Sequence, residues 1–137
     1  MILDLDLDPQ SPVPLYLQIV EQVRRLLALG ALKPGERFLT VRDLGVKARV
    51  NRNTAARAIA ELERDGVVRT RVGQGTYIAD GAPVMDAAAR DASLDAALER
   101  LLVEAHGLGV PPEELGWRLQ RKLEHFARAR RGSAKES

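Results

Sequence analysis

The sequence predicts a mainly α-helical fold with one small β-hairpin, and three observations support this fold class. Apolar residues recur with the period of an α-helix in three separate stretches of the first half of the chain. Two short runs rich in β-prone residues follow, at 67–71 and 76–79, and the connection between them contains glycines. Beyond residue 83, leucines recur at intervals of four and three, which is typical of helices that pack against other helices.

The composition is that of an ordinary globular protein, and the length of 137 residues suits one small domain with an appendage. The absence of cysteine excludes disulfides, zinc–thiolate sites and thiol catalysis. No apolar run reaches transmembrane length, and Asp4, Asp6 and Asp8 interrupt the N-terminus too early for a signal peptide. We therefore expect a cytoplasmic protein that does not enter a membrane.

The opening segment, ILDLDLD, alternates leucine with aspartate. This period of two predicts a short strand over residues 2–8, either half-buried or at a sheet edge. The D-x-D-x-D run also resembles a calcium loop. However, Pro9 and Leu15 stand where such a loop needs glycine and glutamate, so we favour the strand.

Two amphipathic helices are predicted next. Residues 15–29 place apolar side chains on one face and polar ones on the other, and Gly30 ends this helix. Thr40 is a candidate N-cap with Asp43 at the third helical position, which is close to a capping box. This cap begins a short helix over residues 41–48.

A third helix is predicted over residues 52–65, with Asn51 as its N-cap and Gly66 after its end. One face carries the apolar side chains Ala55, Ala58, Ile59 and Leu62. The opposite face carries Asn53, Ala56, Arg57, Ala60 and Arg64. Arginine and asparagine can bond guanine and adenine edges, and alanine allows close approach to thymine methyl groups. The second face therefore suits the major groove of DNA, with an ordinary solvated helix face as the alternative.

The second and third helices have helix-turn-helix spacing, and the hairpin follows directly. Its two strands are separated by residues 72–75, and Arg69 and Arg71 bring charge toward its tip. The order helix, helix, helix, hairpin is that of a winged helix. Gly73 and Gly75 also form a G-x-G, but no third glycine follows at the right spacing and no helix opens there. A dinucleotide site is therefore not expected.

The net charge of the chain is only +2, but the charge is unevenly distributed. Between Thr40 and Thr76 there are eight Arg or Lys against four Asp or Glu, which is a local excess of +4. This excess coincides with the predicted third helix and hairpin. Such a distribution is expected of a surface that binds nucleic acid.

The chain resembles the DNA-binding domain of the GntR family of bacterial transcription regulators in four consecutive stretches: PLYLQIVEQVRRLLALGALKPGERF, TVRDL, VNRNTAARAIAELERDGVV and RVGQGTYIA. The resemblance covers about residues 12–80, with every element in order. It implies DNA contacts by Arg42, by residues 51–54 at the start of the third helix, and by the wing glycine Gly73.

The chain departs from the family pattern around the second helix. Leu39–Thr40 stands where the family usually has Pro-Ser, although threonine can still cap. Gly45 stands where alanine is usual, at a cost of about 1 kcal/mol in helix propensity. Ala48–Arg49 stands where the family favours Leu-Gly, so the resemblance leaves the geometry of this turn open.

Residues 81–137 form the second predicted region, which begins with a short linker at Gly81, Ala82 and Pro83. A first helix ends at Gly107 and Gly109, and Pro111–Pro112 opens a second. Two helices alone have too little core, whereas two copies meeting across a two-fold axis would bury both apolar seams. The predicted dimer contacts are Leu94, Leu98, Leu101, Leu108, Leu115, Trp117, Leu119, Leu123 and Phe126. For Trp117, a partly exposed surface residue and a ligand-pocket wall are the alternatives.

This short two-helix tail resembles the YtrA subfamily of GntR regulators, whose members are homodimers often linked to transporter operons. It is too short for the larger effector domains of other subfamilies. The sequence therefore leaves open whether a small-molecule effector binds, and it identifies no effector.

Catalytic chemistry and cofactor or metal binding are not expected. His106 and His125 each lie on a predicted helix without a second imidazole three or four residues away, and no nucleophile motif is present. Arg128, Arg130 and Arg131 are typical of a solvated helix end, with a second DNA-contact patch as the alternative.

The sequence thus predicts a DNA-binding domain over residues 1–80 and a two-helix dimerisation region over 81–137. The expected function is that of a homodimeric repressor that binds an inverted-repeat operator in double-stranded DNA through the helix 52–65 and the wing 67–79. A winged helix that binds other proteins without specific DNA binding is the alternative, and an enzyme is not expected. The candidate DNA contacts are Thr40, Arg42, Asn51, Arg52, Asn53, Thr54, Arg57, Arg64, Arg71, Gly73, Gln74 and Gly75.

Overall fold

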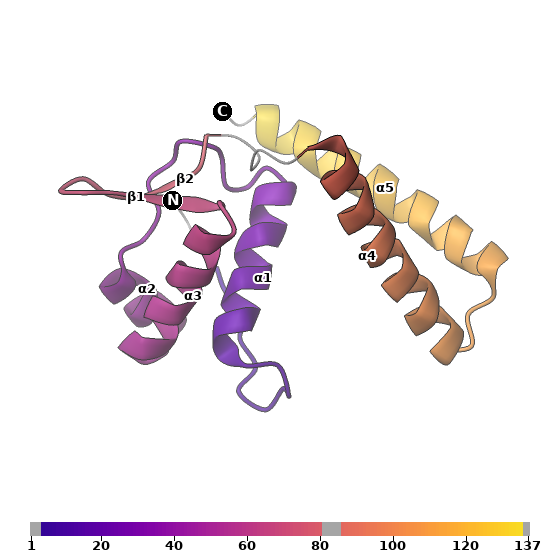
Figure 1. Cartoon of the computed structure of the whole chain (residues 1–137), viewed down its shortest axis with the longest axis horizontal. Helices are drawn as coiled ribbons and strands as arrows, with labels where there is room; N and C mark the ends of the chain where they lie inside the picture. The colour runs from indigo at the N-terminus through magenta and orange to yellow at the C-terminus, as the bar shows by residue number, and fades with distance from the viewer. Residues whose placement is uncertain (1–3, 81–85, 136–137) are drawn as a thin grey trace. The chain divides into compact units, whose positions relative to one another are not determined.

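The computed structural model describes residues 4–80 and 86–135, and the side chains of residues 4–80 and 86–132. The described residues divide into two compact units, one within residues 4–80 and the other within residues 86–132. Residues 4–80 are termed the N-terminal unit below, and residues 86–132 the helical hairpin. The predicted linker at 81–83 lies outside the described residues. The elements, coloured in chain order in Figure 1, are α1 (Leu15–Ala28), α2 (Val41–Ala48), α3 (Arg52–Arg64), β1 (Val68–Arg71), β2 (Gly75–Ile78), α4 (Ala87–Gly107) and α5 (Pro112–Lys135).

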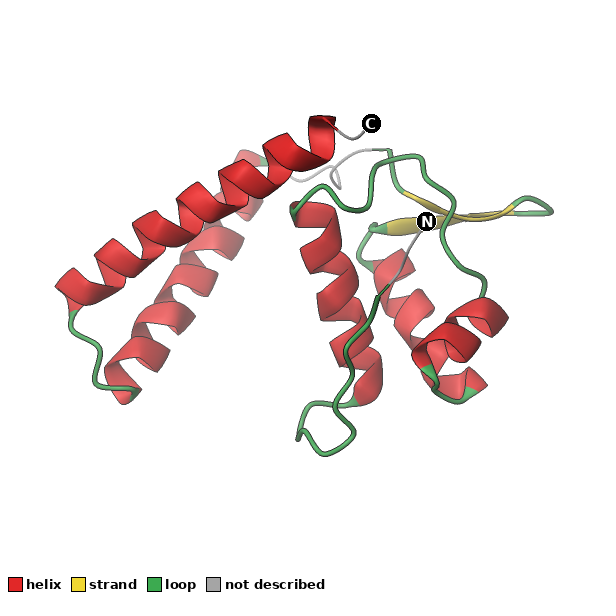
Figure 2. Ribbon diagram, turned by 180° about the vertical axis from the view of Figure 1, so that it is seen from behind, coloured by secondary structure: helices red, strands yellow, loops and turns green. Residues whose placement is uncertain are grey.

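The N-terminal unit encloses a hydrophobic core. Helices α1 and α2 both pack against α3, and α3 also contacts β1 (Figure 2). The three helices and the hairpin surround one apolar cluster. Each large side chain buried here contributes about 1.5 to 3 kcal/mol to stability. The cluster consists of Ile19, Val20, Val23, Leu32, Phe38, Leu44, Ala55, Ala58, Ile59, Leu62, Val68 and Ile78. It includes every residue of the apolar face predicted for the third helix.

The beginnings of α2 and α3 are capped as predicted. The Thr40 hydroxyl oxygen accepts a hydrogen bond from the Asp43 N–H at 3.1 Å. The Asn51 side-chain oxygen accepts one from the Thr54 N–H at 2.8 Å. Each cap satisfies a backbone donor that has no partner within its helix, which fixes where the helix begins.

The turn between α2 and α3 has an unusual backbone at Arg49. This residue follows the end of α2 with a φ of 57°, in the left-handed region that favours glycine. A residue with a Cβ pays about 1 to 2 kcal/mol there. The turn is closed by the Val50 N–H, which donates to the Gly45 carbonyl oxygen at 3.1 Å.

Close packing explains why glycine stands at position 45, although glycine has a low helix propensity. It is buried, and a Cβ at this position would lie 3.3 Å from the Val50 carbonyl oxygen and 3.8 Å from the Ala55 Cβ. The first distance is shorter than an ordinary van der Waals contact. Glycine therefore allows the turn at Arg49 to close tightly against α2.

The predicted N-terminal strand is wrong for residues 4–8, which are extended but pair with no other strand; residues 2 and 3 lie outside the described part of the chain. The segment runs along α1 instead, where two glutamine side chains bond its backbone. The Asp6 N–H donates to the Gln22 side-chain oxygen at 2.8 Å, and the Gln22 amide nitrogen donates back to the Asp6 carbonyl oxygen at 2.6 Å.

Gln18 makes the same reciprocal pair with Asp8, at 2.8 Å and 2.9 Å. Two side-chain amides thus replace the backbone of a neighbouring strand. The predicted alternation is retained, because Leu5 and Leu7 are half-buried against the core whereas the aspartates are exposed. The leucine–aspartate pattern therefore specified an extended backbone and its inward face, but not the kind of partner that the backbone bonds.

Strands β1 and β2 pair antiparallel, with Val68 opposite Ile78. The second edge of β2 is bonded by the segment before α2: the Ile78 N–H donates to the Glu36 carbonyl oxygen at 2.8 Å, and the Phe38 N–H to the Thr76 carbonyl oxygen at 2.7 Å. Val68, Thr76 and Ile78 are buried on the inner face of the hairpin. The base of the hairpin is therefore fixed to the core, while its tip projects away from the three helices (Figure 1).

The helical hairpin is different in character. The Asp86 carboxylate accepts a hydrogen bond from the Ala89 N–H at 2.7 Å and caps α4. After α4 ends at Gly107, the Val110 N–H donates to the Ala105 carbonyl oxygen at 2.9 Å, and Pro112 opens α5. Among the side chains described in this hairpin, that of Ala105 alone is buried. The hairpin therefore has almost no core of its own.

Candidate nucleic-acid interface

Helix α3 turns its second face outward. Asn53, Arg57 and Arg64 are exposed, with the small side chains of Ala56 and Ala60 exposed between them. This is the face predicted from the helical period. Its small residues leave room for close approach of a base edge, and its polar side chains can form hydrogen bonds.

The first turn of α3 combines a helix N-terminus with several polar groups. Arg52 and Asn53 are exposed there. The side-chain oxygen of Asn51 is engaged by the Thr54 N–H, so the amide NH₂ of Asn51 is the group left to donate. The positive end of the helix dipole adds to the charge of Arg52. This turn can therefore bind a phosphate or a base edge that accepts hydrogen bonds.

Helix α2 offers a second helix N-terminus. Thr40 and Arg42 are both exposed there. The Thr40 oxygen accepts the capping bond from Asp43, which leaves its O–H free to donate to an acceptor outside the helix. Arg42 adds a guanidinium with a fixed fork of donors, the geometry that suits phosphate and guanine.

Arg57 is held in place by α1. Its guanidinium lies over the ring of Tyr16, with 4.0 Å between the guanidinium carbon and the ring centroid. Such a cation–π contact contributes about 0.5 to 1 kcal/mol at an exposed site. Tyr16 therefore restricts a cationic side chain on the exposed face of α3 before any ligand is bound.

Arg64 has a different environment from Arg57, although both project from the same helix face. Its guanidinium lies 2.6 Å from the Glu61 carboxylate and 3.8 Å from the Asp65 carboxylate. Asp65 also pairs with Arg24 of α1 at 2.6 Å. Arg64 therefore belongs to an ion-pair cluster at the C-terminal end of α3, which favours a structural role over a DNA contact.

The outer face of the wing is basic. Residues opposite each other in a sheet point to the same side, so Arg69 and its partner Tyr77 share this face with Arg71 and Gly75. The guanidinium of Arg71 lies over the Tyr77 ring, 4.7 Å from its centroid. The Tyr77 hydroxyl donates to the Gln74 carbonyl oxygen at 3.0 Å, which ties the ring to the turn.

The wing turn depends on two glycines. Gly73 has a φ of 75° and nothing within 4 Å of the place where a Cβ would stand, so the tip is open. Gly75 has a φ of 107°, and a Cβ there would lie 3.2 Å from a guanidinium nitrogen of Arg37. The first glycine keeps the tip thin enough to enter a groove, whereas the second makes room for Arg37.

Arg37 is the residue of this surface that the sequence did not reveal. It bridges to Tyr77 across the second edge of β2, which places it on the outer face with Arg69 and Arg71. It follows the turn at residues 34–35 and lies 32 positions before Arg69, where no helical or hairpin pattern assigns it a partner. Arg37 could have been assigned to the wing only if residues 36–38 had been recognised as a third segment of the sheet.

The predicted dimer contacts of the helical hairpin form an exposed apolar surface. Leu115 is half-buried, and the remaining predicted contacts are exposed: Leu94, Leu98, Leu101, Leu108, Trp117, Leu119, Leu123 and Phe126. Trp117 is 61% exposed, with the Arg121 guanidinium 5.0 Å from its ring centroid. Within the described residues of the helical hairpin, the apolar seams predicted from sequence are therefore not buried.

Two helices in helix-turn-helix arrangement, followed by a hairpin with a basic outer face, define the chain as a winged helix-turn-helix protein of the DNA-binding class. The family described as bacterial regulatory proteins, gntR family, matches residues 15–78. The chain belongs to the GntR family, and it is a DNA-binding transcription regulator. No helix in the described part of the chain is both long enough and apolar enough to cross a membrane.

Similarity to known proteins extends beyond the DNA-binding part. The chain is 36% identical over 111 residues to the HTH-type transcriptional repressor YtrA of Bacillus subtilis, covering 81% of this chain and 85% of that protein. A transcriptional antiterminator from Listeria monocytogenes EGD-e has a similar structure, with a TM-score of 0.78 at 28% identity, covering 90% and 92%. A GntR family transcriptional regulator from Listeria monocytogenes gives a TM-score of 0.61 at 27% identity, covering 84% and 98%. These coverages include the helical hairpin and place the chain among YtrA-like members.

Proposed function

We propose that this regulator is a homodimeric repressor that binds an inverted-repeat operator. The observation that carries the proposal is the contrast between two surfaces of one chain. The N-terminal unit exposes polar and cationic groups on α2, α3 and the wing, whereas the helical hairpin exposes leucines, a tryptophan and a phenylalanine. The first surface suits DNA and the second suits a copy of itself.

In this proposal the first turn of α3 enters the major groove. Arg52 and Asn53 contact bases or nearby phosphates, the backbone and side chains at Asn51 and Thr54 bind a phosphate, and Arg57 reaches the backbone from its position on Tyr16. Thr40 and Arg42 of α2 contact the opposite edge of the groove. Arg64 stays a weaker candidate because of its ion pairs with Glu61 and Asp65.

The wing contributes a second set of contacts. Gly73, Gln74 and Gly75 form a thin tip that can approach the sugar–phosphate backbone closely, and Arg71 supplies charge beside it. Arg37 and Arg69 share the outer face with Arg71, and we include both as phosphate contacts. The wing then adds affinity that depends on salt but little on sequence.

The homodimer is supported by the apolar surface of the helical hairpin. Large apolar side chains exposed in such numbers are typical of a protein–protein contact. A two-fold axis would bring the seam of α4 and the stripe of α5 against their copies and supply the core that each hairpin lacks. The same axis would place two recognition helices in successive major grooves.

The sign of regulation is proposed from similarity alone. The relative from Bacillus subtilis is named as a repressor, and we extend that sign to this chain. Repression by occupation of an operator needs no cofactor. The regulator would act in the cytoplasm, where the DNA of a bacterium lies.

The proposal is tested by selecting bound duplexes from a random library with the purified protein, while its mass is measured in solution. Inverted repeats with half-sites about one helical turn apart, recovered by a protein of twice the chain mass, are the expected result. Featureless recovered sequences would instead favour a winged helix that binds other proteins. Recovery of single half-sites by a monomer would overturn the dimer and retain the DNA-binding function.

A further inference from the structure

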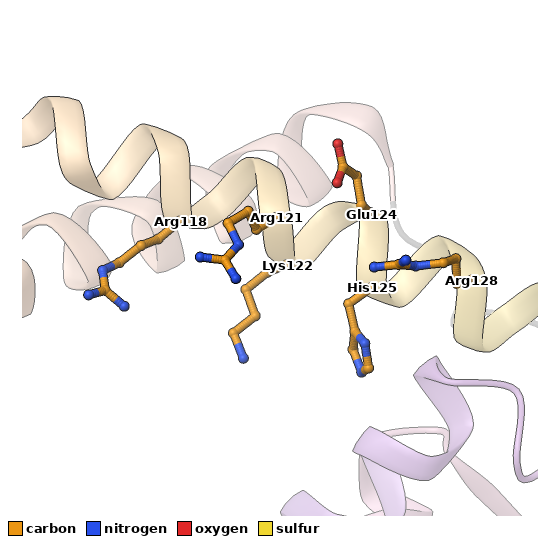
Figure 3. A pocket seen from close by; sticks show the side chains of 6 residues that line it. All are labelled: Arg118, Arg121, Lys122, Glu124, His125 and Arg128. Atoms are coloured by element: carbon orange, nitrogen blue, oxygen red, sulfur yellow. The ribbon is translucent and has the colours of Figure 1, made fainter.

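A row of cationic side chains follows one side of α5. It consists of Arg118, Arg121, Lys122 and Arg128, with the imidazole of His125 between them; all five side chains are exposed and line a common hollow (Figure 3). Their spacing of three, one, three and three residues keeps them within about 120° around the helix. This set is termed the basic stripe below.

The basic stripe has few carboxylates to neutralise it. Arg118 pairs with Glu114 at 3.0 Å. Glu124 also lines the hollow, but Figure 3 shows its side chain directed away from Arg118, Lys122 and His125. Helix α4 has the opposite composition, with four acidic residues against two arginines between Ala87 and Gly107. Positive charge is therefore concentrated on one helix of the hairpin.

The basic stripe is separate from the apolar surface. Leu119, Leu123 and Phe126 lie about 100° to 160° around α5 from the centre of the basic stripe. Burial of these three side chains against a second copy therefore leaves the basic stripe exposed, whereas Trp117, whose ring centroid lies 5.0 Å from the Arg121 guanidinium, borders the stripe on its other side. Arg131 lies about 120° from the same centre on the other side, so the cationic surface is not simply the arginine-rich end of the helix.

We propose that the basic stripe binds the phosphate backbone of duplex DNA, as a contact additional to those of the winged helix. From Arg118 to Arg128 it is about 15 Å long, a length over which duplex DNA carries about nine phosphate charges. Guanidinium and ammonium groups are the usual partners of phosphate. The inference rests on the proposed function, because the winged helix brings the DNA to the protein.

The shape of the basic stripe favours an extended polyanion over a small one. A small-molecule site usually encloses most of its ligand between apolar walls. The side chains of the stripe instead stand exposed along a single helix, and none of them is buried. The contact should therefore add affinity without sequence preference, and it should weaken as salt rises.

The experiment compares the wild type with the variant Arg121→Ala/Lys122→Ala/Arg128→Ala. A matched control, Arg90→Ala/Arg100→Ala/Arg131→Ala, removes the same number of charges outside the basic stripe. Binding to the operator recovered by selection is measured from about 50 to 250 mM KCl, on the operator alone and on the operator with about 20 extra base pairs on each side. The solution mass of each variant is measured in parallel.

The slope of log K against log[KCl] is negative, and each phosphate contact contributes about −0.9 to it. We therefore expect the slope of the stripe variant on the longer duplex to be less steep than that of the wild type by about 2 to 3. The control variant should keep the wild-type slope. A stripe variant that also keeps the wild-type slope would overturn the proposal. If that variant has lost binding of inorganic pyrophosphate, the basic stripe is a site for small anions and not for DNA.

Three outcomes of this experiment have distinct meanings. A stripe variant that becomes monomeric would overturn the proposal in favour of a contact between subunits. Failure of the wild type to recover any operator would refute the proposed function itself. An intact operator preference with an unchanged salt slope would refute the role of the basic stripe alone.

Discussion

The N-terminal unit and the helical hairpin differ in how many of their apolar side chains they bury. The N-terminal unit buries a cluster from three helices and a hairpin, and it exposes mainly polar and charged side chains on α3. The hairpin buries Ala105 alone among its described side chains and exposes a row of leucines. One unit has a hydrophobic core of its own, whereas the described part of the other buries a single alanine. The described part of the chain thus exposes polar and cationic side chains mainly on α2, α3 and the wing, and apolar side chains mainly on the hairpin.

The largest expected effect is loss of the dimer when the apolar seam is broken. Leu98→Asp would place an unpaired carboxylate in each half of a buried interface, which should weaken dimerisation at least about a hundredfold. Operator affinity should also fall about a hundredfold or more, because the second half-site loses its effective concentration. Sedimentation and DNA titration measure both.

Val103→Asp is the matched control for that change. Val103 is exposed on α4, about 140° around the helix from Leu98, so the same charge there should leave the mass and the operator affinity unchanged. If both variants remain dimeric, the apolar seam is not the subunit contact, and the contrast between the two units would need another explanation.

The next largest effect is expected in the first turn of α3. Arg52→Ala should weaken operator binding by about 1 to 3 kcal/mol in a titration at fixed salt. The midpoint of thermal unfolding should hardly change, because Arg52 is exposed and outside the core. Arg25→Ala removes an exposed arginine from α1 and serves as the control. Equal affinities for the two variants would remove Arg52 from the interface.

Arg57 and Arg64 give a sharper comparison within one helix face. Arg57→Ala should weaken operator binding about tenfold, since a cation held at the surface by Tyr16 is lost. Arg64→Ala should change affinity by less than about twofold, because its charge is already shared with Glu61 and Asp65. The reverse order, measured by the same titration, would show that the ion-pair cluster opens toward DNA.

The smallest effect concerns the stability of the N-terminal unit. Arg49→Gly should raise its free energy of unfolding by about 1 kcal/mol, because glycine adopts a φ of 57° without the Cβ penalty. Lys47→Gly, within α2, should lower it by up to about 1 kcal/mol. Denaturant unfolding measures both. Two glycine variants that shift stability in the same direction would contradict the geometry of this turn.

Local signals in the sequence predicted most of the N-terminal unit. The caps at Thr40 and Asn51 placed the starts of α2 and α3 correctly, because a cap acts through hydrogen bonds to the next few residues. The apolar period of α3 identified its buried face for the same reason. Such features depend on neighbours in the sequence and can be recognised without a structure.

Features that depend on distant neighbours could not be predicted. The helical period gives Arg57 and Arg64 the same face, and only the structure distinguishes the Tyr16 ring from the Glu61 carboxylate. Arg37 joins the wing through a sheet segment that lacks strand-like alternation. Helix propensity predicts that Gly45 destabilises α2, and only the structure shows that the turn packs closely against this position.

The hydrogen bonds from Gln18 and Gln22 do not by themselves fix the register of the N-terminal segment along α1. Because leucine and aspartate repeat, a shift of the segment by two residues would again put leucines inward and offer the same backbone groups to Gln18 and Gln22. The turn that follows removes this degeneracy: the Asp8 carboxylate accepts from the Gln10 N–H at 2.9 Å, and the Ser11 N–H donates to the Asp8 carbonyl oxygen at 3.2 Å. The turn after Asp8 thus fixes the register of the leucine–aspartate segment along α1, which the repeat alone does not determine.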